Sequence, residues 1–389
     1  MTLPSAPPPR SRSQDFLELL NRSRRGKLKL YIGFAAGVGK TYRMLEEAHA
    51  LGKRGVDVAL AYIETHGRAD TQALVGGLEI VPRRRFEYRG VVVEEMDLDG
   101  VLARKPQVAI VDEIPHTNVP GSRNTRRWED VVALLDAGIN VIGAMNIQHV
   151  ESLKDLVESK SGVKIRETVP DSFLREADQV VNLDLAVEDL LERLQAGKIY
   201  AREKVTAALE NFFREETLGT LRELALREVA ESLGRAADVE RRAAPEERGG
   251  ATLGRVLVCM ASRSPRAETL LRRGSRIAGR LNTDWFVVYV EPPGETPTTI
   301  DAEIQRHLLE NIQLARDLGA EVVRLKGKDA VAAILDFARS HGVGHIVIGR
   351  SNRSFWRRLL GRSVPQRLLE EAHEFDVQVV ANPGPETPA

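Results

Sequence analysis

A glycine-rich segment, Gly33 to Thr41, has the residue types and spacing of a loop that holds phosphate groups. It follows an apolar run and precedes a predicted helix, so backbone N–H groups and the positive end of the helix dipole would converge on one point. Lys40 would reach the terminal phosphates, and the Thr41 hydroxyl would ligate Mg²⁺. The residues predicted to contact a nucleoside triphosphate are Gly33, Ala36, Gly37, Val38, Gly39, Lys40 and Thr41. The alternative is an ordinary glycine-rich turn between a strand and a helix.

An acidic pair, Asp112-Glu113, directly follows the apolar run Val108 to Val111. An aspartate at the carboxyl end of a strand, beside a phosphate loop, can hold a Mg²⁺-bound water. We therefore predict a magnesium site shared by Thr41 and Asp112. Glu113 is a candidate catalytic residue, because its carboxylate could orient or deprotonate an attacking water. Acidic residues also cap strand ends, so binding without hydrolysis remains the alternative.

Other polar clusters follow strands of the same predicted sheet. They are Glu64 to Arg68, His116 to Asn118, and Asn146 with Gln148 and His149. Ligands of open parallel sheets bind at the carboxyl ends of the strands, so these clusters could contact a γ-phosphate or transmit its presence. The alternative is a set of turn residues and helix caps. Arg123, Arg126 and Arg127 are predicted to lie in a solvated loop. The alternative is a phosphate-contacting arginine, which could also serve a neighbouring subunit.

The elements that would position these residues alternate along the chain. Apolar runs at Leu28 to Ile32, Val56 to Ile63, Val108 to Asp112 and Ile139 to Met145 are predicted strands. Helical periodicity separates them, with a helix predicted from Lys40 to about Lys53. Strands that are apolar throughout and alternate with helices are typical of a parallel sheet covered on both faces. From about Val187 to Leu233 the pattern becomes helical.

A second α/β unit is predicted after a polar stretch. Its five strands are predicted at Val256–Met260, Trp285–Val290, Glu321–Leu325, His345–Ile348 and Val377–Val380, which suits a small doubly wound sheet. The fold class is thus α/β, a parallel-sheet domain with a phosphate loop followed by a smaller doubly wound domain. The predicted boundaries are a tail at 1–14, a first domain at 15–233, a linker or solvated helix at 234–252, a second domain at 253–383 and a tail at 384–389. A short helix is also predicted at Asp15 to Arg24.

The composition excludes several classes of protein. The formal net charge of the 389 residues is zero, which argues against nucleic acid as a partner. The single cysteine, Cys259, cannot form an internal disulfide, which favours a reducing, cytoplasmic location and a buried thiol. No stretch approaches the ~20 apolar residues needed to span a membrane. We therefore expect a soluble, cytoplasmic protein.

Several motifs of the first domain resemble the N-terminal domain of the KdpD family of sensor histidine kinases, which control potassium uptake in bacteria. These motifs are Gly33 to Thr41, Glu64 to Arg68, Pro82 to Gly90, Val111 to Asn118 with Gly121 to Arg123, Asn146 to His149, and Arg166 to Asp171. The usual phosphate loop has four residues between its first glycine and Gly-Lys-Thr, whereas here Gly33 lies one place earlier. This additional residue belongs to the family's pattern. The resemblance implies ATP and Mg²⁺ as ligands.

The second domain resembles the universal stress protein domain that follows in the KdpD family. That resemblance implies a second ATP or cyclic di-AMP as its ligand. Gly349, Arg350 and Ser363 match part of the glycine-rich ATP motif, although Asn352 stands where a second glycine is expected. Ser262 and Ser264, followed by Trp285 and Tyr289, match the spacing of a cyclic di-AMP site, in which the rings would stack on adenine. The alternative is a plain loop and a core strand.

The resemblance implies a regulatory function in a potassium-responsive two-component system. Full-length members continue into four membrane helices and a histidine kinase core, which this sequence does not contain, so we expect no autophosphorylation by the family's route. The implied partner is a histidine kinase, a response regulator or a potassium-transport component, with a homo-oligomer as a further option. Two alternatives stay open: an NTPase whose hydrolysis is the output, and a non-catalytic scaffold.

Overall fold

The computed structural model describes residues 25–88, 90–200, 202–243, 254–261, 267–281, 283–291, 302–327, 329–349 and 364–380. These residues divide into two compact units: one includes the described residues up to Val169 and Phe173–Leu233, and the other includes Pro170–Ser172 and the described residues from Gly234 onward. The helix predicted at Asp15 to Arg24 lies outside the described residues. Within the described part of the chain, no helix is long and apolar enough to cross a membrane.

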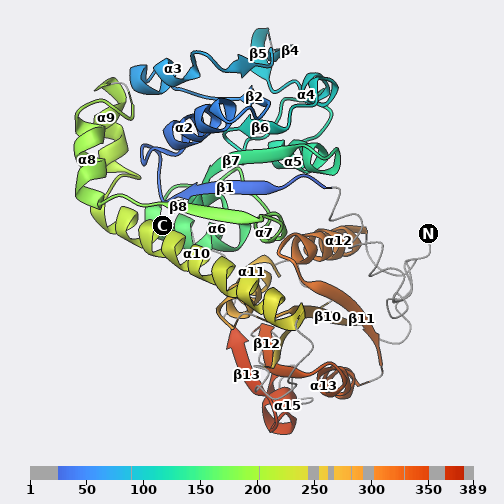
Figure 1. Cartoon of the computed structure of the whole chain (residues 1–389). Coiled ribbons are helices and arrows are strands. Elements are labelled where there is room, and N and C mark those ends of the chain that lie inside the picture. Colours follow the sequence, from blue (N-terminus) through green and yellow to red (C-terminus); the bar gives the residue numbers. More distant parts are fainter. Residues whose placement is uncertain are drawn as a thin grey trace. The chain divides into compact units, whose positions relative to one another are not determined.

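The first unit is built on a six-stranded parallel sheet with the order β3-β2-β6-β7-β1-β8 (Figure 1). The strands are β1 (Leu28–Gly33), β2 (Val58–Tyr62), β3 (Glu79–Ile80), β6 (Val108–Val111), β7 (Asn140–Asn146) and β8 (Gln179–Leu183). An antiparallel hairpin of β4 (Arg84–Tyr88) and β5 (Val91–Glu95) stands apart from this sheet. The four strands predicted here are confirmed, whereas β3, β8 and the hairpin were not predicted.

Helices connect and cover these strands. They are α2 (Lys40–Lys53), α3 (Ala69–Val75), α4 (Leu98–Arg104), α5 (Arg127–Asp136), α6 (Lys154–Ser161), α7 (Asp171–Arg175), α8 (Val187–Gln195), α9 (Arg202–Glu210) and α10 (Glu215–Ala243). Two 3₁₀ turns, η1 (Ile147–His149) and η2 (Glu151–Leu153), follow β7. The helical pattern predicted from Val187 is therefore present, and α10 continues ten residues into the predicted linker.

The inner strands of the first unit, β1, β2, β6 and β7, are mostly apolar because both faces of the sheet are buried there. Alternate residues of β1 point to opposite faces. Leu30 and Ile32 belong to one hydrophobic cluster, whereas Tyr31 packs with Met44 and Leu45 of α2 in another. A parallel sheet covered in this way holds the ends of its strands in place. The polar loops begin at those ends.

The second unit contains a five-stranded parallel sheet with the order β11-β10-β9-β12-β13. Its strands are β9 (Arg255–Cys259), β10 (Trp285–Glu291), β11 (Glu321–Lys326), β12 (Val343–Gly349) and β13 (Asp376–Val380). The helices are α11 (Glu268–Arg280), α12 (Ala302–Asp317), α13 (Ala330–Ser340) and α15 (Val364–Glu371). All five predicted strands are confirmed, and so is the α/β fold class with a doubly wound second unit.

Cys259 lies at the end of β9 and is buried. Burial raises the pKa of its thiol to about 12. The prediction of a core thiol is therefore confirmed.

Candidate nucleotide site

The glycine-rich segment forms the turn between β1 and α2. Gly37 and Gly39 have φ angles of 93° and 99°, in the left-handed region that side chains disfavour. Gly39 is the N-cap of α2, and no side chain caps it. The first turn of α2 also carries no acidic residue, so the positive end of its dipole is not neutralised within the helix. This helix end can accept an anion.

Lys40 begins α2 and turns its ammonium group back over the loop. Its Nζ donates to the carbonyl oxygen of Ala35 at 3.1 Å and to Oδ1 of Asn146 at 2.5 Å. Asn146 ends β7, the strand next to β1. The lysine is thus fixed above the turn, where phosphate oxygens would lie.

Thr41 lies beside the predicted acidic residue of the neighbouring strand. Its hydroxyl donates to Oδ2 of Asp112 at 2.8 Å, and the buried Asp112 also accepts from the backbone N–H of Glu113 at 3.0 Å. A hydroxyl and a carboxylate fit Mg²⁺, which commonly takes one or two protein ligands plus phosphates and water. Among the described residues, no group of three or more His, Cys, Asp or Glu side chains could hold a metal ion alone.

The strand order explains why these residues meet. β7 lies between β1 and β6, and it pairs in parallel with both. The carboxyl ends of the three strands carry the loop, Asn146 and Asp112, in that spatial order. The structure therefore brings together all the predicted residues of the first site, from Gly33 to Thr41 with Asp112 and Glu113.

The charges of the site perturb one another. Burial lowers the pKa of Lys40 to about 8, although the negative charges of Asp112 and Glu113 oppose that shift. Burial and the charge of Glu113 raise the pKa of Asp112 to about 6. Clusters of perturbed groups at one sheet edge are typical of functional sites.

Glu113 has an exposed side chain on a left-handed backbone. Its φ angle is 52°, uncommon for a residue with a side chain. Its Oε1 lies 3.5 Å from Nε2 of His66, which also adopts a positive φ of 51°. This contact lowers the pKa of Glu113 and raises that of His66. The carboxylate is therefore held ionised at the mouth of the site.

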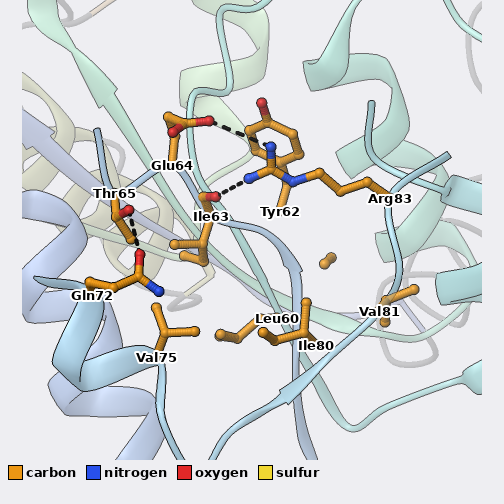
Figure 2. A pocket seen from close by; sticks show the side chains of 11 residues that line it. Leu60, Tyr62, Ile63, Glu64, Thr65, Gln72, Val75, Ile80, Val81 and Arg83 are labelled. Atoms are coloured by element: carbon orange, nitrogen blue, oxygen red, sulfur yellow. Dashed lines mark hydrogen bonds and ion pairs between the residues drawn. The ribbon is translucent and has the colours of Figure 1, made fainter. Parts of the chain in front are cut away.

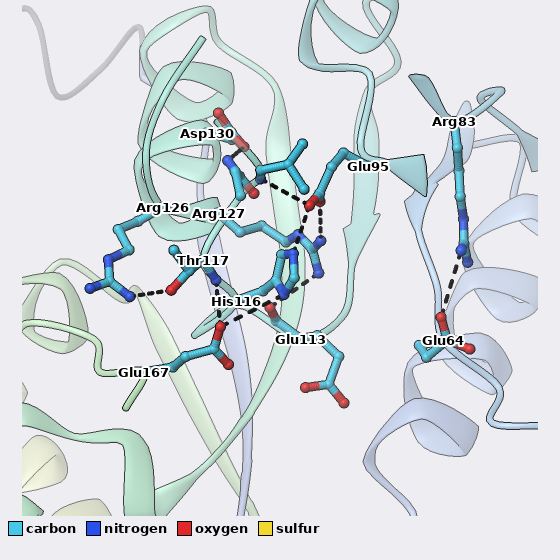
Figure 3. Close-up of polar contacts among 12 residues, drawn as sticks. Glu64, Arg83, Glu95, Glu113, His116, Thr117, Arg126, Arg127, Asp130 and Glu167 are labelled. Atoms are coloured by element: carbon cyan, nitrogen blue, oxygen red, sulfur yellow. Dashed lines mark hydrogen bonds and ion pairs between the residues drawn. The ribbon is translucent and has the colours of Figure 1, made fainter. Parts of the chain in front are cut away.

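The solvated loop predicted for the three arginines is wrong for Arg127, because this residue begins α5 and is completely buried. Its Nη2 donates to Oε2 of Glu95 at 2.9 Å, and its guanidinium carbon lies 3.6 Å from the ring centroid of Tyr62. Its Nη1 also donates to the carbonyl oxygen of Glu113 at 3.3 Å (Figure 3). Arg127 thus stabilises the backbone of the turn that carries Asp112 and Glu113. No spacing in the sequence distinguishes it from Arg126.

Glu95, the ion-pair partner of Arg127, has further polar contacts. His116 Nε2 contacts its Oε1 at 2.9 Å, and the backbone N–H of Val119 donates to the same oxygen at 3.2 Å. Burial alone would raise the pKa of Glu95, but His116 and Arg127 keep it below the usual value. Figure 3 shows the carboxylate of Glu113 pointing away from this buried cluster. The cluster is therefore structural, and the exposed acid remains available to a ligand.

A pocket of about 210 Å³ lies on the β3 side of the sheet, between β2, β3 and α3 (Figure 2). Arg83 closes one side of it, since it stacks on Tyr62 and lies 3.6 Å from Glu64. Its guanidinium also donates to the carbonyl oxygen of Ile63. Arg83 is thus paired with groups outside the phosphate loop. No residue of that loop lines the pocket.

The second unit gives a mixed result for the predicted second ligand site. Gly349 ends β12, and the strand order changes direction between β9 and β12, where doubly wound sheets bind ligands. Trp285 and Tyr289 are only 3% and 7% exposed and belong to the core. They offer no free face for stacking, so the core-strand alternative fits them better. Ser262, Ser264, Arg350 and Ser363 lie outside the described residues.

The fold and the loop define a two-unit α/β protein whose glycine-rich loop lies at the carboxyl edge of its first sheet. Residues 24–233 match the family described as the osmosensitive K⁺ channel His kinase sensor domain, KdpD, and residues 252–380 match the universal stress protein family. The chain therefore belongs to the KdpD family.

Relatives of different lengths support this assignment. A putative sensor protein KdpD from Synechocystis is 44% identical over 92% of this chain and 95% of its own length. The sensor protein KdpD from Escherichia coli is 41% identical over 94% of this chain, and the Mycobacterium tuberculosis protein is 43% identical over 93%. The chain spans 40% and 41% of the lengths of these last two relatives.

Solved structures match the second unit. A universal stress protein from Archaeoglobus fulgidus is 26% identical over 32% of this chain and 97% of its own, with a TM-score of 0.25. A universal stress protein solved in complex with cAMP is 23% identical over 33% of this chain and 96% of its own, with a TM-score of 0.26. The assignment of this unit rests on the family match and on the strand order.

Proposed function

We propose that the chain is a cytoplasmic regulatory module of potassium-responsive two-component signalling, and that it binds ATP with Mg²⁺ between β1 and α2. The observation that carries this proposal is the convergence of Lys40, Thr41 and Asp112 on an uncapped helix end. Family membership supports the signalling role. The partner would be a histidine kinase, a response regulator or a potassium-transport component.

Replacement of Lys40 tests the nucleotide site. Lys40→Ala removes the cation that would contact the terminal phosphates, so we expect ATP binding at this site to be lost in isothermal titration of the full chain with Mg²⁺. Lys27→Ala is the matched control, because Lys27 precedes the same strand but pairs with Asp178 at 2.8 Å. Unchanged ATP affinity in Lys40→Ala would contradict the assignment.

A second candidate function is ATP hydrolysis, which the exposed and ionised Glu113 beside Asp112 favours. A carboxylate at this position could orient the attacking water. Steady phosphate release that disappears in Glu113→Gln, with ATP affinity retained, would establish turnover as an output. Absence of release in the wild type would leave binding alone as the function. A wild-type chain that binds no nucleotide would instead support the scaffold.

We further propose a nucleotide ligand, cyclic di-AMP or a second ATP, for the crevice between β9 and β12. Gly349 at the end of β12 supports this position, because among the described residues an ideal Cβ there would meet Leu270 alone, at 3.6 Å. The buried state of Trp285 and Tyr289 means that recognition would not use stacking on these rings.

A further inference from the structure

Arg68 lies in the loop after β2, directly before α3. His66 and Gly67 both adopt positive φ angles, and the N–H of Arg68 donates to the carbonyl oxygen of Thr65 at 3.0 Å, so the chain reverses before α3. The charge of Arg68 acts on Lys40, and the charges of Asp112 and Glu113 act on Arg68. The guanidinium therefore shares the site of these three residues.

The donors of Arg68 are incompletely used. Its Nη2 donates to the carbonyl oxygen of Ile199 at 3.3 Å, which is a long hydrogen bond. Within the described part of the chain, its buried Nε has no hydrogen-bond partner. Burial lowers the pKa of this arginine. A desolvated cation with unused donors is costly, and a phosphate with two oxygens would satisfy it in the bidentate manner that guanidinium groups favour.

Ile199 connects this arginine to the phosphate loop through the segment between α8 and α9. The buried Ile199 side chain packs over Gly37, where an added Cβ would lie only 2.3 Å from Cδ1 of Ile199. Arg193 of α8 donates to the carbonyl oxygen of Gly37 at 3.3 Å. Figure 1 shows α8 and α9 beside the end of the sheet that carries the loop. One residue of this segment thus contacts both the loop and Arg68.

We propose that Arg68 senses the terminal phosphate of the bound nucleotide and passes its presence to the α8–α9 segment. With ATP bound, the guanidinium turns from the Ile199 carbonyl to the γ-phosphate, and the segment loses one of its attachments. ADP lacks that phosphate, so Arg68 stays on Ile199. The inference rests on the proposed nucleotide site and adds a sensing residue and an output element to it.

Two measurements on the full chain with Mg²⁺ test the inference. The first compares ATP and ADP affinities by isothermal titration. Wild type should prefer ATP, and Arg68→Gln should weaken ATP binding by about tenfold or more, the equivalent of about 1.4 kcal/mol, while ADP binding stays unchanged. The second follows hydrogen exchange in residues 196–200. Exchange should be faster with ATP than with ADP in wild type and equal with both in Arg68→Gln.

Controls separate this inference from the proposed function. Arg83→Gln removes a cation from the same edge of the sheet, but Arg83 contacts Ile63, Tyr62 and Glu64 rather than the loop. It should keep the wild-type responses, whereas Arg68→Lys should restore part of the ATP preference. If wild type binds both nucleotides but Arg68→Gln retains the ATP preference and the exchange difference, the inference is wrong and the site stands. If wild type binds neither nucleotide, the proposed function itself fails.

Discussion

At the scale of residues, the protonation of two groups limits nucleotide binding, one at high pH and the other at low pH. Lys40 must carry its proton to attract phosphate, and its pKa is lowered to about 8. Asp112 must be ionised to hold a Mg²⁺-bound water, and its pKa is raised to about 6. The cause of both shifts is burial, which disfavours the charged form of each group. Lys40 and Asp112 therefore both carry the charge that the ligand needs only in a narrow pH range.

The affinity for Mg²⁺–ATP should thus be highest between about pH 6 and pH 8. Above pH 8 the free protein loses the Lys40 proton, which binding must restore, so affinity should fall by up to about tenfold per pH unit. Below pH 6 Asp112 takes up a proton and magnesium binding weakens. Titration calorimetry from pH 5 to 9 measures the profile.

Asp112→Asn is the control for this profile. The variant has no carboxylate to protonate at this position, so a loss of affinity that remains below pH 6 comes from protonation of ATP itself. The basic limb should persist in this variant. A profile that is flat above pH 8 in wild type would show that Lys40 is not the group that controls binding.

At the scale of elements, the carboxyl end of β6 depends on a buried ion pair. Arg127 at the start of α5 and Glu95 at the end of β5 are 0% and 3% exposed. Arg127 also donates to the carbonyl of Glu113, whose left-handed backbone needs support. The hairpin and α5 therefore fix the geometry of a turn to which neither belongs.

Loss of Arg127 should strongly destabilise the folded protein. Arg127→Ala leaves the buried carboxylate of Glu95 without its guanidinium partner, and the free energy of unfolding should fall by about 3–5 kcal/mol. Arg123→Ala, which removes an exposed arginine paired with Asp99 at 3.0 Å, should cost only about 0–1 kcal/mol. Urea unfolding followed by circular dichroism compares the two. Equal losses would mean that the buried pair has no special role.

The elements also show what the sequence can predict. Strands buried on both faces, such as β1 and β9, have continuous apolar runs that identify them. β8 is an edge strand with a half-buried, partly polar sequence, and the hairpin exposes Val91 and Val92 by 63% and 62%. Neither shows a clear apolar pattern. The burial of Arg127 depends on a tertiary partner 32 residues away, which no local signal reveals.

At the scale of the whole molecule, the chain joins two α/β units whose candidate ligands differ. The first offers a glycine-rich loop with Lys40 at the carboxyl edge of a six-stranded sheet. The second offers the point between β9 and β12 where the order of a five-stranded sheet changes direction. The predicted boundaries at 233 and 253, and the predicted roles of Ser262, Ser264, Arg350 and Ser363, stay predictions. Two independent ligands on one chain would let it respond to two signals.

Gly349 gives a way to separate these signals. Gly349→Asp places a negative charge at the end of β12, where the nearest neighbour of an ideal Cβ among the described residues is Leu270 at 3.6 Å. We expect this variant to lose cyclic di-AMP binding but to keep ATP binding at the Lys40 site, as measured by titration of the full chain. Gly349→Ala, without the charge, should bind both ligands. Wild-type affinity of Gly349→Asp for cyclic di-AMP would contradict the proposed crevice.

The buried Cys259 has a practical consequence for spectroscopy. It is the only thiol in the chain, and a pKa of about 12 keeps it protonated at neutral pH. The thiolate is the form of cysteine that attacks maleimides and thiol-reactive nitroxide reagents, so these reagents should leave Cys259 unlabelled in the folded protein. A cysteine introduced at the exposed Lys198 could therefore carry the sole probe, without prior removal of a native residue. A spin label there would report directly on how the backbone beside Ile199 moves when nucleotide is added.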